Sequence, residues 1–271
     1  MASVALAMMV VSAPGRAAVD LTLTGADGAL ADNLRAHVDT DVSLESDLAG
    51  RFYRDQVRES LRDGAEALGY YEARFDITLT ASPEDWRLDV AVTPGPRVRV
   101  RDVEVRITGD GADDRVLAAL SERLPLRAGE PLNHADYERS KRALINEALQ
   151  RGYFDYRFTT AELAVNVDGG WAEAILVMDA GARYALGEVT FSPSPFRQRF
   201  LSRLVPFEPG TPYTAEAVAD LNQRLLDSGY FTDARVETRR DAGPPARIPV
   251  EADVVTRERN TVTTGAGYST D

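Results

Sequence analysis

The sequence has 271 residues, with 44% hydrophobic and 27% charged side chains, which predicts a folded chain of two or three domains. Its formal net charge of −12 argues against binding to nucleic acid or to an anionic lipid surface. No cysteine is present, so disulfides, cysteine metal sites and cysteine nucleophiles are excluded.

Residues 1–18 resemble a secretory signal segment. Their apolar run over residues 4–11 is too short to span a bilayer and is followed by Pro14, Gly15 and small residues. The basic residues that normally precede such a run are missing, and an apolar first helix of the fold is the alternative interpretation. We expect an exported chain whose folded part begins at Val19.

The first predicted elements are a strand at residues 19–24 and a helix at residues 28–38. A second helix is predicted before Gly69, because apolar side chains recur there at helical spacing. These side chains are Phe52, Val57, Leu61, Ala65 and Leu68. The pattern then changes to alternation, which predicts a β-hairpin with strands at residues 71–80 and 86–92.

The junction between this helix and this hairpin recurs twice. The three segments read LGYYEARFD at residues 68–76, RGYFDYRFT at residues 151–159 and SGYFTDARV at residues 228–236. A repeat at spacings of 83 and 77 residues indicates tandem structural units. In each copy a glycine stands where a helix end favours a left-handed residue. These glycines are Gly69, Gly152 and Gly229.

The second and third copies agree in the elements before the glycine as well. Each has a strand, a shorter helix, a Gly-x-Pro sequence and a longer helix that Asn133 or Thr214 can cap. The shorter helices are expected at residues 112–124 and 195–204. The strands after the glycine are expected at residues 155–167, with a bulge after Phe158, and at residues 232–239.

Every copy therefore has the order strand, helix, helix, strand, strand. One connection between strands holds two helices and the other is a tight hairpin, which predicts a small three-stranded mixed sheet with both helices on one face. The predicted fold class is α+β, in three tandem units.

This order, together with the Gly-aromatic step from second helix to second strand, resembles the POTRA domain. The resemblance covers residues 19–256, and it rests on the threefold repetition rather than on a single motif. It implies POTRA-like units at residues 19–97, 98–183 and 184–256.

The last residues, VTRERNTVTTGAGYSTD, alternate and look like the entry to the first barrel strand of Omp85-superfamily outer-membrane proteins. We therefore expect residues 257–271 to begin a β-barrel whose remainder is missing from this chain. Three POTRA units before such an entry are most similar to the TamA family. BamA-like proteins and two-partner-secretion transporters are the alternatives, and a stand-alone soluble periplasmic interaction module is the third.

The resemblance implies a periplasmic array, held at the outer membrane of a Gram-negative bacterium, that assembles outer-membrane proteins or translocates autotransporters. Its implied partners are unfolded client proteins, a TamB-like partner anchored in the inner membrane, and the outer membrane itself through the barrel. Residues 19–97, which would meet the TamB-like partner, carry 8 basic and 16 acidic residues and so a charge of −8.

In the POTRA arrangement the second strand of each unit lies at a sheet edge, where an extended client can pair with its backbone. Arg74, Arg157 and Arg235 come after the Gly-aromatic steps and are expected to point away from the apolar face, where they would limit aggregation. Ordinary solvated edges are the alternative. The candidate partner-binding residues are Arg74, Phe75, Asp76, Ile77, Thr78, Leu79, Tyr156, Arg157, Phe158, Arg235, Val236 and Glu237.

The sequence offers no catalytic, cofactor or metal motif. His37 and His134 stand apart from each other and from carboxylates at metal-ligand spacing, and His134 is expected at the surface. Asp113 and Asp114 suit the dipole of a helix start, and Glu84–Asp85 a solvated hairpin tip. A repeated periplasmic enzyme would need an acid-base or metal cluster, so we interpret the chain as a protein that binds rather than catalyses.

Overall fold

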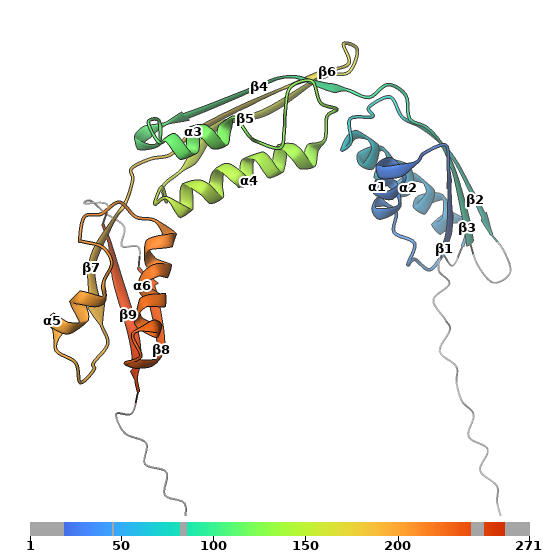
Figure 1. The fold of residues 1–271 in the computed structure, drawn as a ribbon. Coiled ribbons are helices and arrows are strands. Elements are labelled where there is room, and N and C mark those ends of the chain that lie inside the picture. The colour runs from blue at the N-terminus through green and yellow to red at the C-terminus, as the bar shows by residue number, and fades with distance from the viewer. Residues whose placement is uncertain (1–18, 45, 82–85, 240–246, 258–271) are drawn as a thin grey trace, which may run out of the picture. The chain divides into compact units, whose positions relative to one another are not determined.

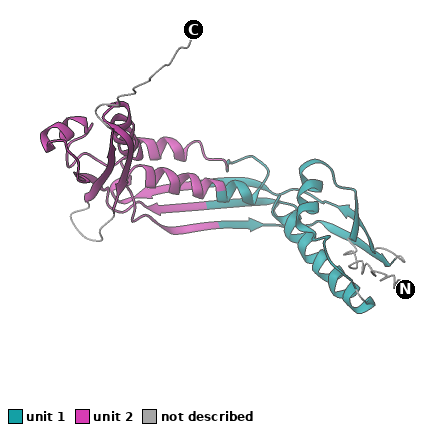
Figure 2. Ribbon diagram, turned by 90° about the horizontal axis from the view of Figure 1, so that it is seen from below, with its two compact units in different colours: residues 1–103, 126–138, 163–174 teal, residues 104–125, 139–162, 175–271 magenta. Residues whose placement is uncertain are grey.

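The computed structural model describes residues 19–44, 46–81, 86–239 and 247–257. The signal-like segment, the Glu84–Asp85 tip and the barrel-like tail from residue 258 lie outside the described residues. The chain divides into two compact units (Figure 2): residues 1–103, 126–138 and 163–174 form the first, and residues 104–125, 139–162 and 175–271 form the second.

The described strands form three sheets, in the orders β1-β3-β2, β4-β6-β5 and β7-β9-β8 (Figure 1). In the first sheet, the central strand β3 pairs parallel with β1 and antiparallel with β2, and the third sheet repeats this arrangement. The predicted α+β fold of three tandem mixed sheets is thereby confirmed. The strands are β1 (Val19–Thr24), β2 (Arg74–Ala81), β3 (Trp86–Thr93), β4 (Arg99–Thr108), β5 (Arg157–Asn166), β6 (Trp171–Asp179), β7 (Ala185–Phe191), β8 (Phe231–Thr238) and β9 (Arg247–Thr256).

Side-chain caps fix the starts of the longer helices. The side chains of Ser46, Asn133 and Thr214 accept hydrogen bonds from backbone N–H groups in the first turn, so the two predicted caps are confirmed. The described helices are α1 (Gly28–His37), α2 (Asp47–Glu66), α3 (Arg115–Ser121), α4 (His134–Gln150), α5 (Gln198–Leu201) and α6 (Ala215–Asp227), with 3₁₀ turns η1 (Gly109–Gly111) and η2 (Ser202–Leu204).

The cores of the first and third sheets lie between the sheet and its two helices. In the first, Leu34 of α1 and Leu61 of α2 pack with Leu88 of β3. The prediction for Phe52 was wrong: its side chain is 68% exposed, and Tyr53 is buried instead. Tyr53 is in phase with the other buried residues of α2, and its hydroxyl donates a 2.6 Å hydrogen bond to the carbonyl of Asp39.

The two shorter helices are shorter than predicted. Helix α3 begins only at Arg115, because Asp114 accepts hydrogen bonds from the N–H groups of Val116 and Leu117 and so caps the helix there. Helix α5 has four residues and continues as η2 to Leu204. Val205 directly precedes Pro206, and a residue before a proline is disfavoured in the helical conformation. Val205 is accordingly extended, and the helix ends there.

The strands after the Gly-aromatic steps also begin later than predicted in the first two copies. Strand β2 begins at Arg74 rather than Tyr71, and β5 at Arg157 rather than Asp155. The chain leaves each left-handed glycine through a further turn, so Tyr156 precedes its strand. Within β5 the alternation of burial slips at Ala161–Glu162, inside the interval where the sequence pattern changes phase.

Candidate protein-binding site

Each sheet places the second strand of its unit at an edge, as expected, and the first strand at the opposite edge. An edge strand presents backbone N–H and C=O groups that another extended chain can pair with. Strand β2 is more regular than β8, since all eight of its residues pair in register with β3, whereas the register of β8 with β9 shifts. The outer side of β2 therefore offers an uninterrupted backbone edge.

The candidate residues on β2 alternate between solvent and core. Arg74, Asp76 and Thr78 are exposed, whereas Ile77 is buried in the core, and Phe75 and Leu79 pack against it. Only the backbone of Ile77 is therefore available to a partner at this edge. Arg74 points away from the apolar face, and within the described residues it forms no ion pair.

The candidate residues of the other two edges are more constrained. Arg157 at the start of β5 pairs with Asp179 at 2.5 Å, while Tyr156 and Phe158 are half-buried. On β8, Arg235 pairs with Glu237, both of which are exposed, and Val236 is half-buried.

The backbone of β8 is also partly used within its own unit. The N–H of Val236 donates to the side-chain oxygen of Asn222 on α6, and the register of β8 shifts between Phe231 and Asp233. An added strand would have to displace the Asn222 contact, so β8 is a less open edge than β2.

The repeated glycine step forms a hydrogen-bonded joint with the start of the next copy. The N–H of Val98 donates to the carbonyl of Gly69, and the N–H of Leu132 donates to the carbonyl of Val98, both at 2.9 Å. The second joint repeats this relay, with Tyr184 donating to Gly152 and Tyr213 donating to Tyr184, again at 2.9 Å. The left-handed backbone of Gly69 and Gly152 confirms the predicted helix ends.

In each joint, an arginine side chain contacts both a backbone carbonyl and an aromatic ring. The Nε of Arg97 donates to the carbonyl of Leu68 at 2.7 Å, and its guanidinium lies 5.3 Å from the ring centre of Tyr70. The Nε of Arg183 donates to the carbonyl of Arg151 at 3.1 Å, and its guanidinium lies 5.6 Å from the ring centre of Tyr153.

Sequence reasoning missed these two arginines. A signal was available, because Arg97 and Arg183 stand at the same place in the repeat, immediately before Val98 and Tyr184, the residues that form the two relays.

The second joint contains a buried charge. Asp114 accepts a 2.7 Å hydrogen bond from Nε of Arg151 and a 3.0 Å hydrogen bond from the hydroxyl of Tyr153, and Arg183 lies 3.8 Å away. Burial acts to raise the pKa of Asp114, but the hydrogen bonds from Arg151, Val116 and Tyr153 outweigh it and hold that pKa below its usual value. The aspartate expected only to suit a helix dipole therefore anchors the joint.

The first joint contains a histidine instead. The hydroxyl of Tyr71 lies 2.7 Å from Nε2 of His134, which is half-buried, so the surface position expected for His134 was wrong. Burial lowers the pKa of His134 despite the nearby carboxylates Glu66 and Glu138, and burial together with Glu66 raises the pKa of Tyr71 to about 12. This contact arises because the helix that starts at His134 is hydrogen-bonded back to the carbonyl of Ala67.

Within the described residues, the third Gly-aromatic step has no following segment packed against its glycine, whereas the glycines of the first two steps have close neighbours. A Cβ atom added to Gly152 would meet Cβ of Tyr213 at 2.8 Å, whereas one added to Gly229 would meet nothing within 4 Å. Tyr230 is 46% exposed, and its ring packs edge-on against Phe196 and Phe200. The aromatic pairs of the repeats are therefore packing residues, and their exposure depends on whether a further unit covers them.

Two other kinds of feature are absent from the described residues. Within them, no three His, Asp or Glu side chains gather as metal ligands would. Among the described helices, none combines the length and apolarity needed to cross a bilayer.

Two family models match the chain. The model "POTRA domain TamA domain 1" matches residues 20–94, and the POTRA model described as "Surface antigen variable number repeat" matches residues 98–171 and 184–262.

Solved structures that match the chain include POTRA3-5 of BamA from Haemophilus influenzae, with 18% identity and a TM-score of 0.46 over 90% of this chain and 99% of that one. POTRA1-3 of Omp85 from Anabaena has 17% identity and a TM-score of 0.37 over 90% and 95%. CdiB from Acinetobacter baumannii has 11% identity and a TM-score of 0.37 over 62% of this chain and 31% of that one.

The sheets, helix pairs and repeated joints define a tandem array of small β-α-α-β-β modules. The chain belongs to the POTRA family, whose models match most of its length.

Proposed function

We propose that this chain is the periplasmic POTRA array of a TamA-type outer-membrane assembly factor, and that it binds extended segments of unfolded outer-membrane or autotransporter clients. Binding proceeds by addition of a client strand to a sheet edge, so that backbone hydrogen bonds give affinity without requiring one sequence. That mode suits a protein that must accept many different clients. The proposed units are residues 19–97, 98–183 and 184–256, and the fact that each sheet draws its strands from one of these intervals supports them.

The single observation that carries this proposal is the open edge of β2. Its eight residues pair with β3 in unbroken register, and Asp76 and Thr78 within it face the solvent. Within the described residues, no other strand or side chain pairs with the outer side of β2. We assign β2 as the principal binding edge, ahead of β5 and β8. The match of residues 20–94 to the first TamA POTRA domain supports the TamA type.

The first proposed POTRA unit, residues 19–97, also suits a dedicated partner. Its charge of −8 is most of the net charge of the chain, so a basic or amphipathic surface is the complementary one. We propose a TamB-like inner-membrane-anchored protein as that partner. A BamA-like or two-partner-secretion protein would use the same edge chemistry with different clients.

Two threonines in the first sheet allow a matched test of the edge. Thr78 on β2 and Thr22 on β1 both pair with Asp89 of β3, from opposite sides, and both are exposed. Because the chain contains no cysteine, Thr78→Cys and Thr22→Cys each introduce one thiol of similar exposure. The probe is a synthetic peptide with the alternating pattern of an outer-membrane strand and a single cysteine, and disulfide formation with the full chain is measured by mass spectrometry.

We expect Thr78→Cys to form severalfold more mixed disulfide than Thr22→Cys, and an excess of cysteine-free peptide to suppress it. Circular dichroism would establish that both variants are folded. Equal yields from the two positions would mean that the peptide meets the thiols by collision, and β2 would not be the binding edge.

A further inference from the structure

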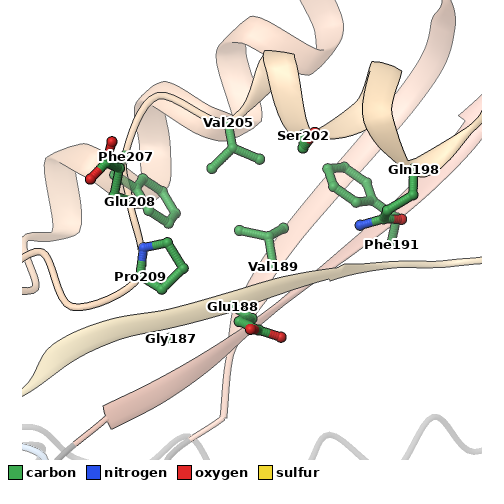
Figure 3. Close-up of a pocket in the computed structure, with 10 residues that line it drawn as sticks. All are labelled: Gly187, Glu188, Val189, Phe191, Gln198, Ser202, Val205, Phe207, Glu208 and Pro209. Atoms are coloured by element: carbon green, nitrogen blue, oxygen red, sulfur yellow. The ribbon is translucent and has the colours of Figure 1, made fainter.

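The third proposed POTRA unit, residues 184–256, has a cavity beside the edge of its first strand, β7. The cavity is about 270 Å³ and lies between β7, the short helix α5 with η2, and the loop at residues 205–209. Figure 3 shows Val189 and Phe191 directed from β7 toward the helical side, with Phe207 and Pro209 at one end. The corresponding first helices α1 and α3 have ten and seven residues, whereas α5 has four, so less of the face of β7 is covered by helix.

The backbone edge of β7 is closed at its start and open beyond it. The N–H of Leu186 donates to Thr211 and its carbonyl accepts from Gly210, so the Gly-x-Pro sequence acts as a short antiparallel plug. Within the described residues, no backbone hydrogen bond occupies the outer side of β7 beyond Leu186. The open edge begins where the plug ends, and it borders the cavity.

The sequence of β7 produces a bulge at this point. Its register with β9 shifts between Leu186 and Val189, and a Cβ atom on Gly187 would lie 2.9 Å from the carbonyl oxygen of Ile248. Glycine is therefore required for this close approach. Bulges often redirect a strand edge next to a functional site.

The chemistry of the lining indicates the kind of ligand. Val189, Phe191 and Val205 are half-buried and apolar, whereas Glu188 and Glu208 are exposed beside them. Neither carboxylate forms an ion pair within the part of the chain that the structure describes. A cavity of this size lies below the range of roughly 300–1,000 Å³ that is usual for small-molecule sites, and it suits a few side chains.

We propose that this groove binds an extended peptide segment that adds antiparallel to β7, continuing the ladder of the Gly-x-Pro plug. The segment places apolar side chains against Val189 and Phe191, and a lysine or arginine next to them pairs with Glu188 or Glu208. This inference rests on the proposed function, that the array binds extended client segments, and it adds a second class of edge with its own sequence preference. The preference is for apolar segments interrupted by basic residues.

The first test fills the groove. Ser202 lies on η2 at the cavity and is exposed, so Ser202→Trp adds bulk into the groove without replacing a core residue. Arg203→Trp, the adjacent exposed position outside the lining, is the matched control. The probe is a fluorescent peptide of alternating valine and lysine, added to the full chain and followed by anisotropy.

The second test reverses the charge at the groove. The double variant Glu188→Lys/Glu208→Lys is compared with Glu59→Lys/Glu122→Lys, which changes the net charge equally at exposed positions elsewhere. We expect the groove variant to raise the Kd of the valine-lysine peptide by about tenfold at low salt, where exposed charge pairs are least screened, with a smaller rise for the control. A valine-glutamate peptide should show the opposite preference.

A crosslinking arm separates this inference from the proposed function. The same peptide, carrying one cysteine, is offered to Ser202→Cys, to Thr78→Cys on β2 and to Ala118→Cys, an exposed position on α3. Mixed disulfide at Ser202→Cys above the Ala118→Cys level, together with loss of binding in Ser202→Trp, supports the groove. Crosslinking at Thr78→Cys alone overturns the groove and leaves the edge function standing, and crosslinking at neither position overturns both.

Discussion

The guanidinium of Arg183 lies 5.6 Å from the centre of the Tyr153 ring, and Arg97 has the same relationship to Tyr70 at 5.3 Å. In both joints the same arginine also donates to the carbonyl of the residue before the glycine. A cation over an aromatic ring and a directed hydrogen bond both depend on the planar guanidinium, which a lysine ammonium does not reproduce.

Arg183→Lys should therefore loosen the second joint while it keeps the charge. We expect the amide hydrogen of Tyr184, which donates to Gly152 in this joint, to exchange about thirtyfold faster, because one hydrogen bond and one cation–π contact together contribute about 2 kcal/mol. Hydrogen exchange measured by mass spectrometry tests this. Arg199→Lys on α5 is the control, and an unchanged Tyr184 amide would show that the arginine does not stabilise the joint.

Asp114→Asn should destabilise the second joint by about 2–3 kcal/mol, because the Arg151 guanidinium would lose its charged acceptor at a site where the aspartate side chain is only 2% exposed. The asparagine oxygen can still cap α3, and its NH2 group then faces the Arg151 guanidinium, so the change removes both the charge and the acceptor at this position. Urea titration measures the loss. The exposed neighbour Asp113→Asn should stay within about 0.5 kcal/mol of the parent, and equal effects at the two positions would contradict a role for the buried charge.

Two glycine substitutions separate backbone strain from joint packing. Gly152 and Gly229 both have positive φ, at 87° and 76°, so alanine at either position costs about 1 kcal/mol. Gly152→Ala also forces a Cβ atom to 2.8 Å from Tyr213, which should add about 1–3 kcal/mol. Thermal unfolding of both variants measures the difference, and a Gly229→Ala loss as large as that of Gly152→Ala would show that the joint tolerates the added methyl group.

The stability of the first joint should fall as pH is lowered below neutrality. Because burial lowers the pKa of His134 in the folded chain, the unfolded chain binds this proton at a higher pH, near 6.5, and acidification favours unfolding. This contribution is complete above about pH 6.5 and is lost as pH falls toward the lowered value.

His134→Gln keeps a polar side chain opposite Tyr71 and removes the titration. We expect its free energy of unfolding to decline less between pH 7 and pH 5 than that of the parent chain, as measured by urea titration at each pH. Parallel declines would show that His134 does not contribute in this range.

Local patterns predicted most of the elements. The strand at residues 19–24, the capped helices after Asn133 and Thr214, and the left-handed glycines Gly69, Gly152 and Gly229 all depend on interactions within a few residues. The apolar periodicity predicted the wrong bounds where a local hydrogen bond set them, as at Asp114, which caps α3 and makes it begin later than predicted. The periodicity also chose Phe52 in place of Tyr53, although Tyr53 is four residues before Val57 and so shares its helix face.

The candidate site was predicted only in part. Its strands and their exposed residues agree with the alternation in the sequence, and the edge position of β2 came from the resemblance to POTRA domains. The sequence did not predict that the backbone of β8 is less accessible to an added strand than that of β2. This difference depends on tertiary contacts such as the hydrogen bond from Val236 on β8 to Asn222 on α6.

The sequence by itself determined that three similar units succeed one another, because repeated glycines, caps and alternations encode the same local structure each time. Only the tertiary structure decided that Arg97 and Arg183 close the joints, that Asp114 is a buried anchor, and that the β7 edge is open beyond its plug. These features bring together residues far apart in the chain. Their burial and hydrogen bonding are set by packing, which local patterns do not contain.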